Sequence, residues 1–519
     1  MNPKIKKVLK VIVKYFQISN DKYWLPIIWL SLLYHLFIST VLKLKLIFIS
    51  ILMLVVVQSE MVKAGKAAGP LKVSTINPRY FTDGSGRAIL LTGSHTWDNL
   101  QDITKENDNH IFNFTAYLNW LMKYNHNFIR MWAWEQSKWH PRMTSGFLFG
   151  PKVYMRTGPG TALDGSPKFD VDKFNQPYFD RLRARVVEAG ERGIYVSVML
   201  FEGWSIEAKG ANQENPWYGH PFHSENNVNG IDGDINEDNE GKETHSMSDD
   251  PGIKAVRVLQ ENYVKKVIDT LNDLDNVMWE ISNESHRNSE QWQYYIVNFI
   301  KNYEANHKPK QHPVWMTVEW EPGNNKQNNP DVFNSPADAV SPNSEGGYRD
   351  NPPQGNGNKV IIADTDHLWG VGGNKEWVWK SFLRGLNPVF MDPYDSYYYN
   401  AYGHDDTPFD LKWEPIRKNM GYVRTYADKM NLTYMIPHNE LVSTSYCLAN
   451  PGSEYLVYQP SSDTVFTVNL VAGTYSFEWF NPALGSIEDS GRITTESGNH
   501  SFKAPFSGDA VLYIKTERH

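Results

Sequence analysis

Eight short apolar runs recur along the chain, and this repeat restricts the possible fold more than any other feature. Each run has the length of a strand, and its nearly continuous apolar composition is typical of strands buried on both faces. Amphipathic stretches with helical spacing separate most of the runs, at 113–124, 176–192, 253–274 and 289–306. The eight runs are 88–93, 128–132, 194–201, 276–281, 314–318, 337–341, 360–364 and 388–392.

This alternation predicts parallel strands joined by crossover helices. Eight such units in about 350 residues fit a closed barrel better than an open sheet. We therefore predict an α/β fold in which residues 68–435 form a TIM (β/α)8 barrel. A short hairpin at 78–86, with a turn that contains glycine, precedes the first strand.

After residue 435 the pattern changes to period-two alternation between turns rich in Gly, Pro, Asn and Ser. The alternating segments are 454–458, 464–470, 474–480 and 510–515. This pattern predicts a small all-β sandwich domain over 436–519.

The first 67 residues predict a leader rather than part of the fold. A basic start precedes an apolar run at 23–42, long enough to span a bilayer. A second run, 46–57, is followed by Val62-Lys63-Ala64 as a candidate cleavage site and has the anatomy of a signal peptide. Two interpretations stay open: a true start near Val41, or a membrane helix ahead of the signal. Both predict export, whether secreted, periplasmic or membrane-tethered.

Charge and composition limit the classes of partner that the protein could bind. The net charge is −8 and no long basic run follows the leader, which argues against nucleic acid or an anionic membrane surface. Membrane contact is expected only through the leader. Cys447 is the single cysteine, so an intrachain disulfide or a cysteine metal site is excluded. The chain contains 18 Trp, and flat aromatic rings suit a poly- or oligosaccharide ligand, so we predict that the protein binds such glycans. We also predict a monomer.

Ionisable residues gather where the fourth run ends. In a TIM barrel the active site lies at the C-terminal ends of the strands. The run 276–281 contains Glu280 and leads directly into Asn283, Glu284 and His286. One interpretation is a glutamate that caps the next helix, but two acids beside an amide favour a catalytic role.

Residues 279–284 resemble the strand-end Asn-Glu of the clan A glycoside hydrolases. That resemblance implies that Glu284 is a general acid/base and that Asn283 binds a sugar 2-hydroxyl. It also matches Arg130, in the second run, to the arginine that those barrels place beneath the nucleophile. Residues 70–519 resemble barrels with a C-terminal β module labelled as collagen-binding, through 80–84, 93–97 and 477–482.

The second carboxylate departs from that family, which has a glutamate at the end of the seventh strand. Here the seventh run ends with Asp364 and Asp366, which share a strand face by parity. His367 follows, as a ring residue often follows the nucleophile, and this favours Asp366. A structural role in bonding strand-end amides is the other interpretation. Reserve candidates after the fifth and eighth runs are Glu319, Glu321 and Asp392.

Glycosidic hydrolysis explains why a carboxyl pair is needed. One group stays protonated to donate to the leaving oxygen, and the other is ionised to attack the anomeric carbon or activate water. Burial or a nearby negative charge must raise the pKa of Glu284. A separation of about 5 Å gives retention and about 6.5–9.5 Å gives inversion, and retention is the default. We therefore predict a glycosidase that cleaves O-glycosidic bonds.

Further substrate-binding candidates fall at predicted strand ends, and we expect some of them to belong to the core. His95 is either a sugar contact or a structural histidine. The stretch 217–223, after the third strand, predicts a loop over the substrate. The candidates are His95, Trp97, Trp134, His286, Trp320 and Trp369.

An acidic segment in that loop matches the ligand spacing of a calcium loop. Glu237 stands where such a loop requires glycine, and no flanking helix pair is evident. We therefore favour a solvated loop and predict no cofactor, with calcium as the weaker alternative. The calcium candidates are Asp232, Asp234, Asn236, Asp238 and Glu243.

A rival function is a catalytically inactive barrel that acts as an exported glycan- or matrix-binding protein. The missing seventh-strand glutamate keeps this rival open. A polysaccharide lyase would need a Tyr or His base beside an arginine that neutralises a uronate, and the sequence shows no such cluster.

Overall fold

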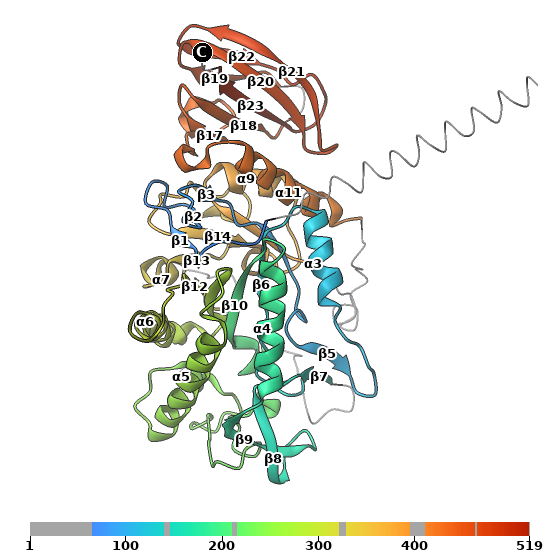
Figure 1. Cartoon of the computed structure of the whole chain (residues 1–519), viewed down its shortest axis with the longest axis vertical. Coiled ribbons are helices and arrows are strands. Elements are labelled where there is room, and N and C mark those ends of the chain that lie inside the picture. Colours follow the sequence, from blue (N-terminus) through green and yellow to red (C-terminus); the bar gives the residue numbers. More distant parts are fainter. Residues whose placement is uncertain are drawn as a thin grey trace, which may run out of the picture. The chain divides into compact units, whose positions relative to one another are not determined.

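The computed structural model describes residues 65–139, 146–209, 215–320, 328–394, 411–461 and 464–517 (Figure 1). The predicted leader, 1–67, lies outside the described residues except for 65–67, and so does the reserve acid Glu321. Within the described ranges, no helix combines the length and apolar character needed to cross a bilayer.

Eight parallel strands form the predicted barrel, and every residue in them is buried. This burial on both faces explains why the sequence shows continuous apolar runs rather than alternation. The fold prediction of a TIM (β/α)8 barrel is confirmed. In sheet order the strands are β4 (Gly93–His95), β15 (Asn387–Met391), β14 (Val360–Asp364), β13 (Ala339–Ser341), β12 (Val314–Thr317), β11 (Val277–Asn283), β10 (Tyr195–Glu202) and β6 (Phe128–Met131).

Asn127 links β4 and β6, the two strands at the ends of the sheet order, and the junction between them is called the seam. Its backbone N–H donates to the Thr92 carbonyl at 3.0 Å, and its side-chain amide donates to the Leu90 carbonyl at 2.9 Å. Its Oδ1 accepts from the Thr92 N–H at 3.0 Å. Gly93 is required here, because a Cβ would lie 2.2 Å from the Phe128 carbonyl oxygen. The seam therefore depends on one amide and one glycine.

Helices surround the barrel at the predicted positions (Figure 1). Pro251 begins α5, where its missing N–H costs nothing, and the Asp250 side chain caps the helix by accepting from the Gly252 N–H. The helices are α3 (Phe114–Lys123), α4 (Gln176–Gly190), α5 (Pro251–Leu271), α6 (Glu290–His307), α7 (Asn329–Asn334), α8 (Thr365–Leu368), α9 (Lys375–Leu383) and α11 (Glu414–Lys429).

The first predicted strand, 88–93, needs correction. Its start, β3 (Ala88–Ile89), belongs to a three-stranded antiparallel sheet with β1 (Lys72–Val73) and β2 (Phe81–Thr82). The barrel strand begins only at Gly93. Leu90 and Leu91 between them are buried, so the apolar run continues where the strand changes partners. A hairpin follows Pro78, but its second strand is β3, which lies outside the predicted range 78–86.

Two antiparallel strand pairs outside the barrel were not predicted: the first joins a segment before β6 to one after it, and the second is a hairpin between β6 and β10. They pair β5 (Asp102–Lys105) with β7 (Phe147–Gly150) and β8 (Tyr154–Thr161) with β9 (Pro167–Phe174). Tyr154 and Phe169 of the second pair pack in one apolar cluster with Trp217 and Phe222. The predicted substrate loop at 217–223 is therefore anchored by two fully buried rings.

The C-terminal segment forms two antiparallel sheets that share one apolar cluster. The opposite face of the larger sheet packs on the barrel helices, where the Trp379 and Tyr458 rings stack at 6.2 Å between centroids. The larger sheet contains, in order, β16 (Ile436–Pro437), β17 (Cys447–Asn450), β18 (Glu454–Gln459), β23 (Ala510–Thr516), β20 (Gly473–Asn481) and β21 (Ser486–Thr495). The smaller sheet pairs β19 (Phe466–Leu470) with β22 (Gly498–Phe502).

Replacing Asn127 tests the seam. Asn127→Ala leaves the Thr92 N–H and the Leu90 carbonyl buried without partners, so the free energy of unfolding should fall by about 2–4 kcal/mol. Denaturant unfolding followed by tryptophan fluorescence measures this change. The matched control is Asn119→Ala on the exposed face of α3, which should stay within about 0.5 kcal/mol of the wild type. Equal stability of the two variants would contradict a seam held by Asn127.

Candidate active site

Arg130, on β6, is the centre of a buried polar cluster. Its Nη1 donates to Asp364 Oδ2 at 3.0 Å and to Asp366 Oδ2 at 2.8 Å. Its Nη2 donates to Asn283 Oδ1 at 2.7 Å, and its Nε to Glu280 Oε2 at 3.2 Å. The structure thus brings the predicted residues of the second, fourth and seventh strands to one guanidinium.

Asp364 is the fully engaged acid of the cluster. Its Oδ1 accepts from His95 Nε2 and from the Asp366 N–H, both at 3.0 Å, while Oδ2 accepts from Arg130. Burial alone would raise the pKa of Asp364, but His95 and Arg130 outweigh it and hold that pKa well below its usual range. Asp364 is therefore a buried group that is ionised near neutral pH.

His95 has no nitrogen left for a ligand. Its Nδ1 accepts from Trp132 Nε1 at 2.9 Å, and an indole nitrogen can only donate. The imidazole proton is therefore on Nε2, which donates to Asp364. Of the two interpretations of His95, the geometry favours the structural one.

The expectation that Asp364 and Asp366 share a strand face is wrong. β14 ends at Asp364, and Asp366 lies in the first turn of α8. The cause is local: the Asp364 side chain caps α8 by accepting the Asp366 N–H, which ends the extended backbone. Both acids nevertheless reach Arg130, from different elements.

Asp366 keeps some accessible surface, with its side chain 7% exposed. Its Oδ2 contacts Arg130, and among the described residues no group donates to its Oδ1. Burial raises the pKa of Asp366; Arg130 opposes this effect and the charge of Asp364 adds to it.

Glu284 follows β11 in a left-handed backbone conformation, with φ +43°. Its Oε2 accepts from Trp204 Nε1 at 2.6 Å, and its backbone carbonyl accepts from Lys209 Nζ. Gly203 is required beside it, because a Cβ would lie 2.2 Å from the Glu284 carbonyl oxygen. Burial raises the pKa of Glu284 and the charge of Asp366 adds to it, while Lys209 and the Trp204 hydrogen bond oppose.

His367 supports Asn283 as a neutral ring. Its Nε2 lies 3.2 Å from Asn283 Oδ1, and its Nδ1 lies 2.8 Å from the Ser341 hydroxyl oxygen. Burial, with Arg130 adding to it, lowers the pKa of His367 to about 4. Arg130 and His367 together fix which way the Asn283 amide faces.

Sequence reasoning missed Glu202, the last residue of β10. It is fully buried, and its Oε1 accepts from the Trp204 N–H at 3.0 Å and from Asn283 Nδ2 at 3.2 Å. The signal was present, because Glu202 directly follows an apolar run, as the Asn283-Glu284 pair does.

The predicted aromatic residues divide by depth. Trp97 and Trp134 are 7% and 4% exposed and belong to the core, with Trp134 Nε1 donating to the Trp97 carbonyl at 2.8 Å. Trp320 and Trp369 are partly exposed, as is Trp204. His286 Nε2 donates to the Lys242 carbonyl at 2.8 Å, and burial lowers the pKa of His286 to about 4.

The described reserve acids lie outside the Arg130 cluster. Asp392 is buried and paired with Arg417, whose Nε and Nη2 donate at 2.9 and 2.7 Å. Glu319 is buried, and burial raises its pKa to about 8. Neither shares a hydrogen bond with Glu284 or Asp366 among the described residues.

The calcium candidates bond mainly within their own loop. Both Asp234 oxygens accept backbone N–H groups, from Asp238 and Asn239, at 3.0 and 2.9 Å. Asn236 Nδ2 donates to Asp238 and Glu243, and the Asp232 side chain accepts the Asp234 N–H. In the described ranges, no three His, Cys, Asp or Glu side chains are grouped so that they could hold a metal ion.

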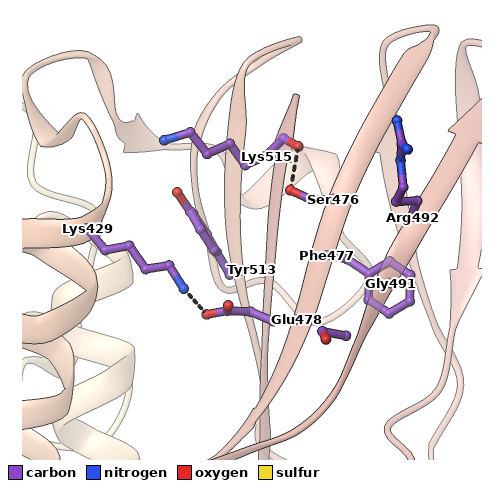
Figure 2. Close-up of a pocket in the computed structure, with 9 residues that line it drawn as sticks. Lys429, Ser476, Phe477, Glu478, Gly491, Arg492, Tyr513 and Lys515 are labelled. Carbon is purple, nitrogen blue, oxygen red and sulfur yellow. Dashed lines mark hydrogen bonds and ion pairs between the residues drawn. The ribbon is translucent and has the colours of Figure 1, made fainter. Parts of the chain in front are cut away.

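A separate groove of about 370 Å³ lies between α11 and strands β20, β21 and β23 of the larger C-terminal sheet (Figure 2). Lys429 of α11 pairs there with Glu478, and Tyr513 and Lys515 of β23 point into the same space. None of the candidate acids lines this groove.

Comparisons with known proteins give one family match and a likeness to solved structures. The family described as "Domain of unknown function (DUF6298)" matches residues 91–319. The chain is similar to a solved structure described as "Glycoside hydrolase", with 14% identity, 86% of this chain and 97% of that chain covered, and a TM-score of 0.55. It is also similar to a glycoside hydrolase family 5 structure from Bacteroides vulgatus ATCC 8482, with 13% identity, 86% and 93% coverage, and a TM-score of 0.56. No curated protein matches the chain.

At these identities the likeness concerns the barrel fold. It supports the barrel part of the clan A resemblance. The collagen-binding label of the C-terminal module is not tested and stays a prediction.

Replacing Arg130 should reveal its electrostatic role. In the wild type, the pKa of Asp364 is lower in the folded protein than in the unfolded chain. Its pairing therefore stabilises the fold above the unfolded value of about 3.9 and is lost as pH falls through the folded value. Arg130→Met should cost about 3–5 kcal/mol near pH 7, because it leaves buried carboxylates unpaired.

That loss should shrink as pH falls and the unpaired carboxylates take up protons. Unfolding titrations at several pH values measure it. Arg183→Met, which removes the exposed pair with Asp273, is the matched control and should cost about 1 kcal/mol or less. A loss independent of pH would contradict the role of Arg130 as a counter-charge.

Proposed function

We propose that the protein is a glycosidase that hydrolyses O-glycosidic bonds of a poly- or oligosaccharide, with Glu284 as acid/base and Asp366 as nucleophile. The supporting observation is accessibility. Glu280, Asp364 and Glu202 are fully buried, whereas Glu284 and Asp366 each keep exposed surface. Substrate can reach only the latter two among these five acids.

Their surroundings favour opposite protonation states. The Asp366 carboxylate contacts the Arg130 guanidinium, which favours its ionised form. The Glu284 carboxyl contacts the neutral indole of Trp204, while the Lys209 ammonium bonds to its backbone carbonyl. A proton shared by the pair should therefore be held by Glu284.

The proposed reaction uses this difference. Glu284 gives its proton to the glycosidic oxygen as the bond to the anomeric carbon breaks, and Asp366 Oδ1 forms an ester with that carbon. Glu284 then takes a proton from water, and the water oxygen replaces Asp366. Two displacements retain the anomeric configuration, and Asp364 acts only by orienting Arg130.

Substrate contacts follow from the same geometry. Trp204, Trp320 and Trp369 are the partly exposed rings that can stack on sugar faces, and Asn283 is the amide next to the acid/base. Export as a monomer, without nucleic-acid partners or a cofactor, and a separate sandwich domain over 436–519 complete the proposal. The apolar leader supports export, the acidic composition argues against a nucleic-acid partner, and the change of pattern at 435 supports the domain boundary.

Removing either acid tests the mechanism. Glu284→Gln and Asp366→Asn should each lower kcat by about 10²–10⁴-fold on a responsive glycan, without changing thermal stability by more than about 1 kcal/mol. Glu496→Gln, in the exposed turn after β21, is the control and should have wild-type kcat.

Release of reducing ends from a polysaccharide panel identifies the substrate, and NMR of the first product anomer reports the stereochemistry. Undiminished turnover by Glu284→Gln would contradict the proposed mechanism. A first product of inverted configuration would make Asp366 a base that activates water. A wild type that binds glycans without cleaving any would leave the inactive, glycan-binding alternative.

The Trp204 hydrogen bond predicts a shift in the pH profile. Because Glu284 must be protonated, kcat/KM should fall as pH rises through its raised pKa. The Trp204 N–H stabilises the ionised form, so Trp204→Phe should raise that pKa and move the alkaline limb to higher pH. Trp369→Phe, which removes an indole N–H that does not bond to Glu284, should leave the alkaline limb in place. A shift to lower pH in Trp204→Phe would contradict the assignment of Glu284.

A further inference from the structure

We propose that Glu202 is a neutral carboxylic acid that positions Asn283 and Trp204, the two neighbours of Glu284, and this inference rests on the proposed function. Glu202 ends β10, beside the end of β11, with Glu202 paired to Asn283 in the parallel register. It is a positioning residue, because it acts through the groups that it holds.

The direction of its hydrogen bonds is fixed by the surroundings. Asn283 Oδ1 already accepts from Arg130 Nη2 at 2.7 Å, so the amide nitrogen of Asn283 must face Glu202. The Trp204 backbone N–H can only donate. Both bonds therefore end on Glu202 Oε1, which acts as a double acceptor.

The other oxygen of Glu202, Oε2, identifies the protonated form. It is buried, and it has no hydrogen-bond partner among the described residues. A carboxylate would place negative charge on this oxygen without a donor, at a large desolvation cost. A carboxylic acid with its proton on Oε2 leaves Oε1 as the carbonyl acceptor that the two N–H groups require.

The charged groups around Glu202 do not supply the missing donor. Lys209 bonds instead to Glu207 and to the Glu284 carbonyl, and Arg130 is engaged by its own partners. The Glu135 carboxylate accepts the Glu202 N–H at 3.0 Å, so it supplies no donor to Glu202 Oε2. The Glu135 oxygens lie 3.2 Å from His220 Nε2 and 3.9 Å from His245 Nε2. Burial raises the pKa of Glu202 well above its usual value, and the charge of Glu284 adds to this.

Neutrality matters for the acid/base. Trp204 links the two acids, because its backbone N–H bonds to Glu202 and its indole N–H bonds to Glu284. An ionised Glu202 would push the pKa of Glu284 up further by repulsion. A neutral Glu202 holds the same geometry without that effect.

The first test observes the proton directly in the resting full-length protein. The infrared difference between wild type and Glu202→Gln at pH 7 should contain the carbonyl band of a protonated carboxyl that only the wild type has. Glu319→Gln is the positive control, because burial raises the pKa of Glu319 to about 8. Absence of the Glu202 band would overturn the proposal, and this measurement does not depend on any hydrolytic activity.

The second test uses kinetics. Glutamine keeps the carbonyl acceptor and adds no charge, so Glu202→Gln should keep kcat/KM within about threefold and leave the alkaline limb unchanged. Glu202→Ala frees Asn283 and Trp204 and should lower kcat/KM by about 100-fold through misplaced groups.

A limb that moves to lower pH in Glu202→Gln would show that the variant removed a negative charge, and the neutral acid would be excluded. If Glu202→Ala fails to fold, the glutamine variant still decides. Failure of the proposed function is a separate result, because it would appear as full activity in Glu284→Gln or as a wild type that cleaves no glycan, and the infrared measurement still decides the state of Glu202.

Discussion

A fully buried guanidinium is the constraint on which the rest of the site depends. Arg130 cannot lie in the barrel interior unless negative groups surround it, because the cost of an unpaired buried charge exceeds that of most other defects. Glu280, Asp364 and Asp366 supply those charges from β11, β14 and α8. The ends of three elements are therefore fixed relative to one another by one side chain.

The acids of the candidate site differ in how deeply they are buried. Asp364 and Glu280 are sealed within the barrel and serve as counter-charges, whereas Asp366 and Glu284 remain reachable. The polar atoms around each acid set its proton affinity: a guanidinium beside Asp366, and an indole N–H beside Glu284. The difference in protonation that we propose for these two carboxyls would thus follow from their neighbours rather than from their residue type.

The sequence predicted the barrel and part of the candidate site. Parallel strands buried on both faces leave continuous apolar runs, and an acid just after such a run lies at the C-terminal rim of the barrel, as Glu284 does. Periodicity could not show where the first strand changes partners, because Leu90 and Leu91 remain apolar through the bend. It also could not show depth, so Trp134 in the core and Trp320 at the surface looked alike. His95 bonds to Asp364 and Trp132, and Glu202 bonds to Asn283, all distant in the sequence, so no local pattern reports these contacts.

The long sequence separations in the cluster have a consequence for how the chain is made. Arg130 lies 150 residues before Glu280 and 234 residues before Asp364. During synthesis from the N-terminus, the arginine therefore leaves the ribosome well before the charges that will neutralise it. It must stay hydrated until β11 and β14 exist, so the early strands cannot reach their final packing. Completion of the ring and burial of this cation become a single late event in the folding of the nascent protein.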